Sequence, residues 1–237
     1  MTNRFKNAIG EEYSLFKLAV PHYDKLQDKL ANRIIEESKS NNKESIDILE
    51  IGCGPGYTTL FILKADPRTK VTALDDESIM IDQAKEVLKS FVDAGRVRLA
   101  PNDALDFLKK AKDDSFDAIV SSYTLHNFKQ DYRKQVLIEC YRVLKKGCLF
   151  ANADKYARDN KESHKEDLQW QIKQFGVYDS INRPDLKEMW TKHYLEDENP
   201  EIMMYEGASL NELTKLNYKG VKTIYRNNME AIIIGKK

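Results

Sequence analysis

Three glycines at alternate positions, Gly52, Gly54 and Gly56, follow an apolar run that ends at Ile51. Glycine lets the backbone turn sharply and lets a bound molecule come close to the main chain, because it has no side chain. The apolar run has the composition of a buried strand, and a helix is expected from about Thr58. A glycine loop between a strand and a helix is a common ligand-binding element, although a turn without a ligand would also use glycine.

The spacing of these glycines argues against two phosphate-binding loops. A dinucleotide-binding fingerprint, GxGxxG, would place its third glycine at position 57, where this chain has Tyr57. A P-loop would end in Gly-Lys followed by Ser or Thr, and this loop has no such ending. The loop therefore has no obvious phosphate group to bind.

Short β-rich runs alternate with amphipathic stretches of helical length on either side of this loop. Strands are predicted at residues 46–51, 70–74, 96–100, 116–121 and 148–153. Helices are predicted between Ile79 and Phe91 and between Tyr132 and Leu144, and Gly95 and Gly147 stand at the expected helix ends. Residues 221–225 and 230–235 predict a hairpin. The pattern indicates an α/β fold with a parallel sheet, helices on both faces and an antiparallel end.

The composition limits the classes of function. The 237 residues are 41% hydrophobic, enough for one domain with a sizeable core. Lys+Arg and Asp+Glu are both 38, so no net charge attracts nucleic acid or an anionic membrane. No signal-peptide core or membrane-spanning run is visible, so a cytoplasmic protein is expected. The cysteines Cys53, Cys140 and Cys148 lack CxxC spacing, so we expect reduced thiols and no metal site.

The loop and the motifs after it resemble a known family. Residues 50–56, EIGCGPG, are similar to the E/DxGxGxG loop of class I S-adenosylmethionine-dependent methyltransferases. Later motifs follow in that family's order: VTALDDESIMIDQA, then NDA at 102–104, FDAIVSSYTLHNF and YRVLKKGCLFANAD. The resemblance covers about residues 46–153 and 210–237. It implies a Rossmann-like, doubly wound α/β sheet of seven strands, mostly parallel, with an antiparallel C-terminal hairpin, and S-adenosylmethionine as the cofactor.

The resemblance also implies roles for the residues of a cofactor site. Asp75, which ends the second strand, would accept hydrogen bonds from both ribose hydroxyls, while Asp76 better suits a carboxylate at a helix N-terminus. Asp103 would accept from the adenine amino group, and Met80 would pack on the ring or simply fill the core. Glu50 would lie near the methionine amine. The cofactor-binding residues implied are Glu50, Gly52, Cys53, Gly54, Gly56, Asp75, Asp76, Met80, Asn102, Asp103, Ala104 and Ser121.

Catalysis by such a site would rest mainly on alignment of the acceptor and exclusion of water, because the sulfonium already activates the methyl group. A general base is optional. His126 is the first candidate, since it follows the fourth strand at the carboxyl edge of the sheet, but a hydrogen-bonded structural histidine fits equally well. Tyr123 could orient a substrate or only pack.

We expect one methyltransferase domain over residues 1–237. Within it, 1–45 would form an N-terminal helical cap, 46–153 and 210–237 the cofactor-binding core, and 154–209 a helical insert that closes over the acceptor as a lid. Asp154 and Tyr156 lie just past the fifth strand, where they could contact the acceptor or merely cap and pack.

The expected function is methyl transfer to a small-molecule acceptor, without nucleic acid or membrane as a partner, and the oligomeric state is left open. One alternative is an enzyme that cyclises or otherwise converts S-adenosylmethionine without a methyl acceptor. Another is a non-catalytic module that keeps the cofactor-binding fold as a surface for a partner. A tRNA or protein acceptor also stays open, although the neutral charge gives tRNA no support.

Overall fold

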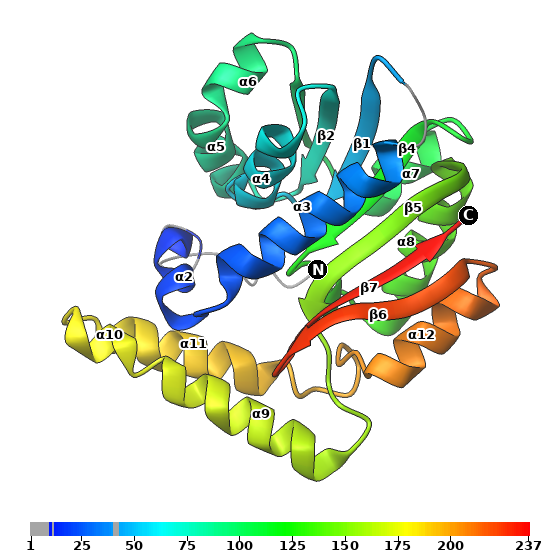
Figure 1. Ribbon diagram of the computed structural model, residues 1–237. Coiled ribbons are helices and arrows are strands. Elements are labelled where there is room, and N and C mark those ends of the chain that lie inside the picture. The colour runs from blue at the N-terminus through cyan, green and yellow to red at the C-terminus, as the bar shows by residue number, and fades with distance from the viewer. Residues whose placement is uncertain (1–9, 11, 40–42) are drawn as a thin grey trace.

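A central sheet carries helices on both of its faces in the computed structural model of the chain (Figure 1). The structure describes residues 10, 12–39 and 43–237, so part of the expected N-terminal cap lies outside the described residues. The sheet has seven strands in the order β3-β2-β1-β4-β5-β7-β6. The first five strands pair in parallel, whereas β7 is antiparallel to both β5 and β6. The predicted fold class, with its reversed C-terminal hairpin, is confirmed.

The strands lie close to the predicted ranges. They are β1 (Ile46–Ile51), β2 (Thr69–Asp75), β3 (Val97–Pro101), β4 (Phe116–Ser122), β5 (Leu144–Lys155), β6 (Lys219–Asn227) and β7 (Glu230–Lys236). The main difference is that β5 begins before the predicted residue 148, because Leu144 already pairs with Phe116 of β4. The expectation that Gly147 ends a helix was therefore wrong. It lies inside β5, at a φ of 75°, near an irregularity in the β4–β5 register.

The helices form two layers. One layer contains α3 (Tyr23–Lys39), α4 (Tyr57–Ala65), α5 (Ser78–Val87) and α6 (Lys89–Asp93), and the other contains α7 (Ala104–Lys110), α8 (Gln130–Val143) and α12 (Glu206–Lys215). Side chains of β1 pack against both helix layers. Ile46 and Ile48 belong to one buried cluster, and Leu49 and Ile51 belong to the other. This double burial explains the nearly continuous apolar run of the strand. No helix in the described part of the chain is long and apolar enough to cross a membrane.

The N-terminal arm and the insert lie together at one end of the sheet (Figure 1). The arm consists of η1 (Tyr13–Leu15) and α2 (Phe16–Ala19), and the insert contains α9 (Lys161–Gln174), α10 (Val177–Ser180) and α11 (Pro184–Glu196). The Trp190 ring of α11 packs on Phe16 with centroids 4.5 Å apart, and the Tyr178 hydroxyl donates to the Leu15 carbonyl over 3.3 Å. The aromatic residues of the insert therefore hold the arm in place.

Candidate functional site

A pocket opens at the carboxyl edge of the parallel strands, beyond β1, β2 and β4. Its empty volume is about 960 Å³, including the part open to solvent. The pocket residues come from the glycine loop and the start of α4, from the segments that follow β2, β3 and β4, and from Tyr13 of the N-terminal arm and Tyr23 of α3. The predicted site residues that line it are Gly52, Cys53, Gly54, Asp75, Asp76, Met80, Asn102, Ala104 and Tyr123. Ligands of open parallel sheets bind at this edge, where the strand order reverses.

The glycine loop is tightly packed on one side and open on the other. Gly52 has a φ of 68°, and a Cβ on it would lie only 2.2 Å from side-chain atoms of Thr124, so no larger residue fits. Gly54 has a φ of 52°, and no described atom lies within 4 Å of the place a Cβ would take. The open side of the loop therefore lies at Gly54, where the main chain faces the pocket.

Asp75 ends β2 beside this loop. Its Oδ2 accepts the backbone N–H of Gly54 over 2.8 Å, and its Oδ1 accepts that of Glu77 over 3.0 Å. Burial raises the pKa of Asp75 to about 6, and the two N–H donors partly oppose this rise. An ionised carboxylate offers about four acceptor sites, so both oxygens can accept further hydrogen bonds from a bound ligand.

Glu50 is fully buried in β1 and does not line the pocket. Its Oε2 accepts the Thr59 hydroxyl over 2.5 Å, whereas its buried Oε1 has no hydrogen-bond partner among the described residues. Burial raises the pKa of Glu50 to about 8, so the carboxyl is largely protonated near neutral pH. Buried polar atoms without partners are uncommon, and this one lies just before the glycine loop.

Three other predicted residues make structural contacts outside the pocket lining. Asp103 caps α7, accepting the Asp106 N–H over 3.0 Å and the Tyr132 hydroxyl over 2.8 Å. Ser121 donates its hydroxyl to the Ile51 carbonyl over 3.1 Å inside the sheet. Gly56 is the N-cap of α4, at a φ of 85°. The neighbours of Asp103, Asn102 and Ala104, do line the pocket.

Tyr123 forms part of an aromatic wall of the pocket. Its ring stacks on Tyr23 with centroids 5.8 Å apart and meets Phe16 edge-on at 5.6 Å. The buried hydroxyl has no hydrogen-bond partner in the described part of the chain. Because burial raises the pKa of Tyr123 well above its usual value, the phenol stays protonated and can donate a hydrogen bond but cannot act as a base near neutral pH. The backbone φ of 48° at Tyr123 is rare for a bulky residue and holds the ring at this edge.

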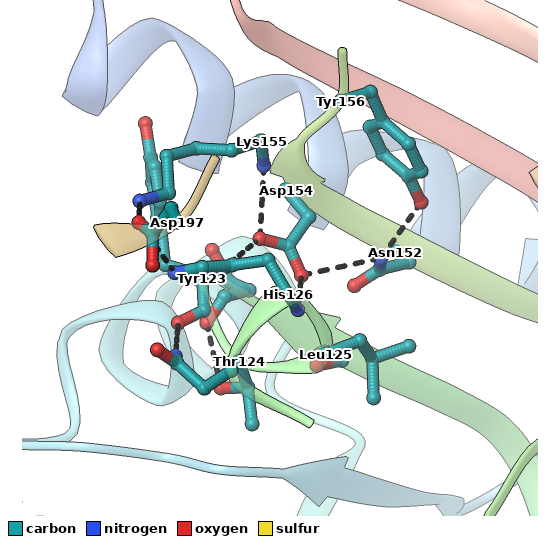
Figure 2. A network of polar contacts seen from close by, with 12 residues as sticks. Tyr123, Thr124, Leu125, His126, Asn152, Asp154, Lys155, Tyr156 and Asp197 are labelled. Carbon is teal, nitrogen blue, oxygen red and sulfur yellow. Dashed lines mark hydrogen bonds and ion pairs between the residues drawn. The ribbon is translucent and has the colours of Figure 1, made fainter. Parts of the chain in front are cut away.

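His126 lies in η2 (Leu125–Asn127), after β4, but it is not among the residues that line the pocket. Figure 2 shows its ring directed at Asp154, with Nδ1 only 2.6 Å from Oδ1, while its backbone N–H donates to Oδ2 over 3.3 Å. Burial lowers the pKa of His126, and the Lys155 ammonium adds to this effect. This geometry is that of a neutral imidazole whose Nδ1–H donates to Asp154, which favours the structural interpretation of His126 over a base in contact with an acceptor.

Gln27 ties helix α3 to the wall of the pocket. Its Nε2 donates to the Ser122 hydroxyl over 2.9 Å, and its Oε1 accepts the Thr58 hydroxyl over 2.8 Å. Thr58 and Ser122 both line the pocket, and Gln27 itself is fully buried. The sequence analysis did not single out these three residues. The only signal for Thr58 and Ser122 was their place beside the glycine loop and the fourth motif.

No residue of 154–209, all of which the structure describes, lines the pocket. Asp154 accepts hydrogen bonds from His126, and Tyr156 accepts one from Asn152 Nδ2 over 2.7 Å. The insert reaches the pocket only indirectly, since Trp190 meets the edge of Tyr13 at 6.1 Å and Tyr13 is a lining residue.

Comparisons with known proteins agree with this architecture. A family model described as a methyltransferase domain matches residues 48–147. The chain is 35% identical over 127 residues to a malonyl-[acyl-carrier protein] O-methyltransferase of a Paenibacillus species, covering 51% of this chain and 45% of that protein. It is 29% identical over 143 residues to a demethylmenaquinone methyltransferase of Thermotoga maritima, covering 60% of this chain and 56% of that protein. These alignments span about half the length of the two relatives.

The likeness to solved structures extends to the fold of nearly the whole chain. A crystal structure from Methanococcus maripaludis, assigned to the S-adenosyl-L-methionine-dependent methyltransferases, superposes with a TM-score of 0.63 at 19% identity. The superposition covers 98% of this chain and 95% of that one. The family match from residue 48 to residue 147 contains the glycine loop, Asp75 and the segment after β4, which together build most of the pocket. Residues 48–147 therefore match a methyltransferase domain, and nearly the whole chain shares its fold with a structure assigned to the S-adenosylmethionine-dependent methyltransferases.

Proposed function

We propose that the protein transfers a methyl group from S-adenosylmethionine to a small-molecule acceptor. The observation that carries this proposal is the pairing of Gly54 with Asp75 in the lining of a pocket that the stacked rings of Tyr23 and Tyr123 also line. Two similar proteins are named for methylating malonyl-[acyl-carrier protein] and demethylmenaquinone. Those names support an acceptor whose reacting end is a small organic group.

The residues present fit S-adenosylmethionine. Gly54 offers an open side where the cofactor could lie against the main chain, and Asp75 keeps acceptor sites for two ribose hydroxyls. The unpaired Oε1 of Glu50 suits the cationic amine of the methionine moiety, reached directly or through a water. Met80 is buried and lines the pocket near Asn102, where an adenine ring would pack. Each carboxylate oxygen of Asp103 already accepts one hydrogen bond, from the Asp106 N–H or from the Tyr132 hydroxyl. A contact between Asp103 and the adenine amino group would therefore use a second lone pair on one of these oxygens.

When bound, S-adenosylmethionine supplies a methyl group activated by its sulfonium. The protein then has to orient the acceptor and exclude water. In this proposal Tyr123 donates a hydrogen bond to the acceptor, because its hydroxyl is buried, protonated and without a partner in the described residues. His126 keeps the β4 segment in place through Asp154, so transfer does not depend on a histidine base.

In this proposal the insert acts as a lid indirectly, through the N-terminal arm. The insert governs access through Tyr13 and Phe16, which contact Trp190, rather than by covering the acceptor itself. Hydrogen exchange measured with and without S-adenosylhomocysteine tests this idea. The η1–α2 arm should gain protection on binding, and α9 to α11 should gain less. Equal protection of both segments in the two states would leave the insert as a static support.

Calorimetry and product analysis test the function as a whole. The purified protein should bind S-adenosylmethionine and S-adenosylhomocysteine but not NAD, since the loop lacks the dinucleotide spacing. A screen of small acceptors with methyl-labelled cofactor should then give S-adenosylhomocysteine and a labelled product. Methylthioadenosine without a methylated product would instead favour an enzyme that converts the cofactor. Tight binding without turnover on any acceptor would favour a non-catalytic module.

A further inference from the structure

We propose that His126, His193 and Asp197 form a binding site for a divalent transition-metal ion of the zinc type, separate from the pocket. One ligand atom from each of the three side chains lies within 4.8 Å of the other two, and all three residues are buried. The sequence analysis expected no metal site because the cysteines lack CxxC spacing. It did not consider these three residues, which come from two distant segments and follow no contiguous ligand motif.

The geometry is close to that of a metal centre. Asp197 Oδ2 lies 3.9 Å from His126 Nε2 and 3.9 Å from His193 Nε2. Two ligands of a tetrahedral zinc ion, each bonded at about 2.0–2.1 Å, stand about 3.3 Å apart. These two separations need to close by about 0.6 Å for an ion to bind, and the separation between the two histidines, which is at most 4.8 Å, by up to about 1.5 Å. His193 and Asp197 are four residues apart at the end of α11, so they project from the same side of the helix.

The surroundings of His126 also match those of a metal ligand. Its Nδ1 is bonded to Asp154 Oδ1 at 2.6 Å, which leaves Nε2 directed toward Asp197 (Figure 2). A carboxylate on the far nitrogen of a ligand histidine fixes the ring and its tautomer in many zinc sites. Asp154 is itself held by the Lys155 N–H at 2.8 Å and by Asn152 Nδ2 at 3.4 Å. The histidine is thus pre-oriented as a neutral ligand.

The donor set indicates which ions the site would take. Two imidazole nitrogens and one carboxylate oxygen suit zinc and its neighbours in the first transition row rather than magnesium or calcium, which prefer oxygen ligands. A small cavity borders two of the three residues, His126 and Asp197, and could hold a water as fourth ligand. Three protein ligands with a water in the fourth position is an arrangement that zinc adopts in other proteins.

The Lys155 ammonium is the main competitor for this site, because its Nζ forms an ion pair with Asp197 Oδ2. The chain offers this ammonium a second partner. Lys155 and Glu230 are paired across β5 and β7, so their side chains lie on the same face of the sheet. Glu230 is buried, and its Oε1 has no hydrogen-bond partner among the described residues. When a metal ion binds the Asp197 carboxylate, the Lys155 ammonium can therefore form an ion pair with Glu230 instead.

Metal titration of the purified full-length chain tests the proposal without any activity assay. After removal of metals with a chelator, the wild-type protein should bind about one Zn²⁺ per chain in competition with a chromogenic chelator. Co²⁺ should give the absorption bands of a four-coordinate site. Bound Zn²⁺ should also raise the melting temperature, because a ligand of the native state stabilises it.

Variants decide whether the bound ion sits at the proposed residues. His193→Gln should weaken Zn²⁺ binding by about 100-fold and abolish the rise in melting temperature. The matched control is His164→Gln: His164 is also buried in the insert and pairs with Glu198 at 2.9 Å, but it is not one of the three ligands. This variant should bind zinc like the wild type.

Lys155→Met gives the sharpest distinction from a plain ion-pair cluster. Removal of the competing ammonium should tighten Zn²⁺ binding by about tenfold or more, since a like charge then no longer faces the ion. A cluster that serves only as an ion pair would show no stoichiometric binding in either the wild type or this variant, and that result would overturn the proposal. Equal losses of affinity in His193→Gln and His164→Gln would overturn it as well, because His164 lines the same small cavity and the ligand set would then differ from the proposed one.

Discussion

The backbone N–H of Gly54 donates to Asp75 Oδ2 over 2.8 Å, so the loop after β1 is joined directly to the end of β2. Two motifs that stand 21 residues apart in the chain thereby form one edge of the pocket. Because the same carboxylate also accepts the Glu77 N–H, its position is determined before it contacts a ribose. The proposed cofactor site is in this sense pre-organised, which reduces the entropy lost on binding.

Replacement of this carboxylate is the most direct test of the cofactor site. Asp75→Ala should weaken S-adenosylhomocysteine binding by about 1.5–3 kcal/mol, the range for hydrogen bonds to a charged group. Asp76→Ala, one residue further on in the same pocket, should cost less. Calorimetry measures both affinities, and circular dichroism checks that both variants fold. An Asp75→Ala variant that folds and binds normally would show that another carboxylate holds the ribose.

Glu50 should couple cofactor binding to proton release. With a pKa of about 8 its carboxyl is mostly protonated near neutral pH, and a cationic amine beside it would favour the ionised form. Binding of S-adenosylmethionine should therefore release up to about one proton, and affinity should rise with pH up to the pKa of the free protein. Calorimetry in buffers of different ionisation enthalpy measures this release. Glu50→Gln should remove it, and an unchanged release in that variant would point to a different group.

Gly54→Ala should impair binding more than folding. The φ of 52° makes a side chain at this position costly by about 1–2 kcal/mol, and the new methyl group would enter the space proposed for the cofactor. Gly95→Ala is the matched control, because Gly95 has a φ of 68° and open surroundings but lies outside the pocket lining. Both variants should lose similar stability in urea, whereas only Gly54→Ala should lose affinity for S-adenosylhomocysteine. If the two variants bound S-adenosylhomocysteine with equal affinity, the glycine loop would not be part of the cofactor site.

Tyr123→Phe should separate orientation of the acceptor from binding of the cofactor. Removal of a buried hydroxyl without a partner should not lower stability, because no described hydrogen bond is lost. If the hydroxyl donates to the acceptor, turnover should fall by about tenfold, equivalent to about 1.4 kcal/mol, with unchanged affinity for S-adenosylhomocysteine. Steady-state kinetics on an acceptor found in the screen, with calorimetry alongside, gives both values. Normal turnover would leave the ring with a packing role only.

His126→Asn should lower stability rather than turnover. The change removes one of the two donors to Asp154 Oδ1, the other being the Lys155 N–H, and leaves a buried carboxylate short of a hydrogen bond, at a cost of about 1–3 kcal/mol. Turnover at a temperature where the variant is folded should stay within about threefold of the wild type. A fall of about 10² to 10⁴ with intact cofactor affinity, and a wild-type rate that follows a histidine-like pKa, would restore His126 as the general base.

Much of the fold could be predicted from the sequence because the signals are local. The periods of apolar residues located all seven strands to within a few residues, and β1 agrees with its predicted range at both ends. The glycine spacing after Ile51 identified the loop that lines the pocket, and the family resemblance of the second motif identified Asp75 at the strand end beside it. These features depend on neighbouring residues, whose order along the chain already determines which face of a strand or which turn they occupy.

The roles of several side chains depended on contacts between distant segments, which local patterns do not encode. His126 had the right position after β4 for a base, but only the packing of β5 and α11 brought it to Asp154, 28 residues away, and to Asp197. The composition of the insert suggested a segment that covers the pocket, yet Trp190 and Tyr178 contact the N-terminal arm and no aromatic residue of the insert lines the pocket. The lid role itself stays a prediction. By itself the sequence determined which elements form and at which edge of the sheet the pocket opens. Only the tertiary structure decided which polar groups stay unpaired and which buried charges meet, because burial and pairing depend on the path of the whole chain.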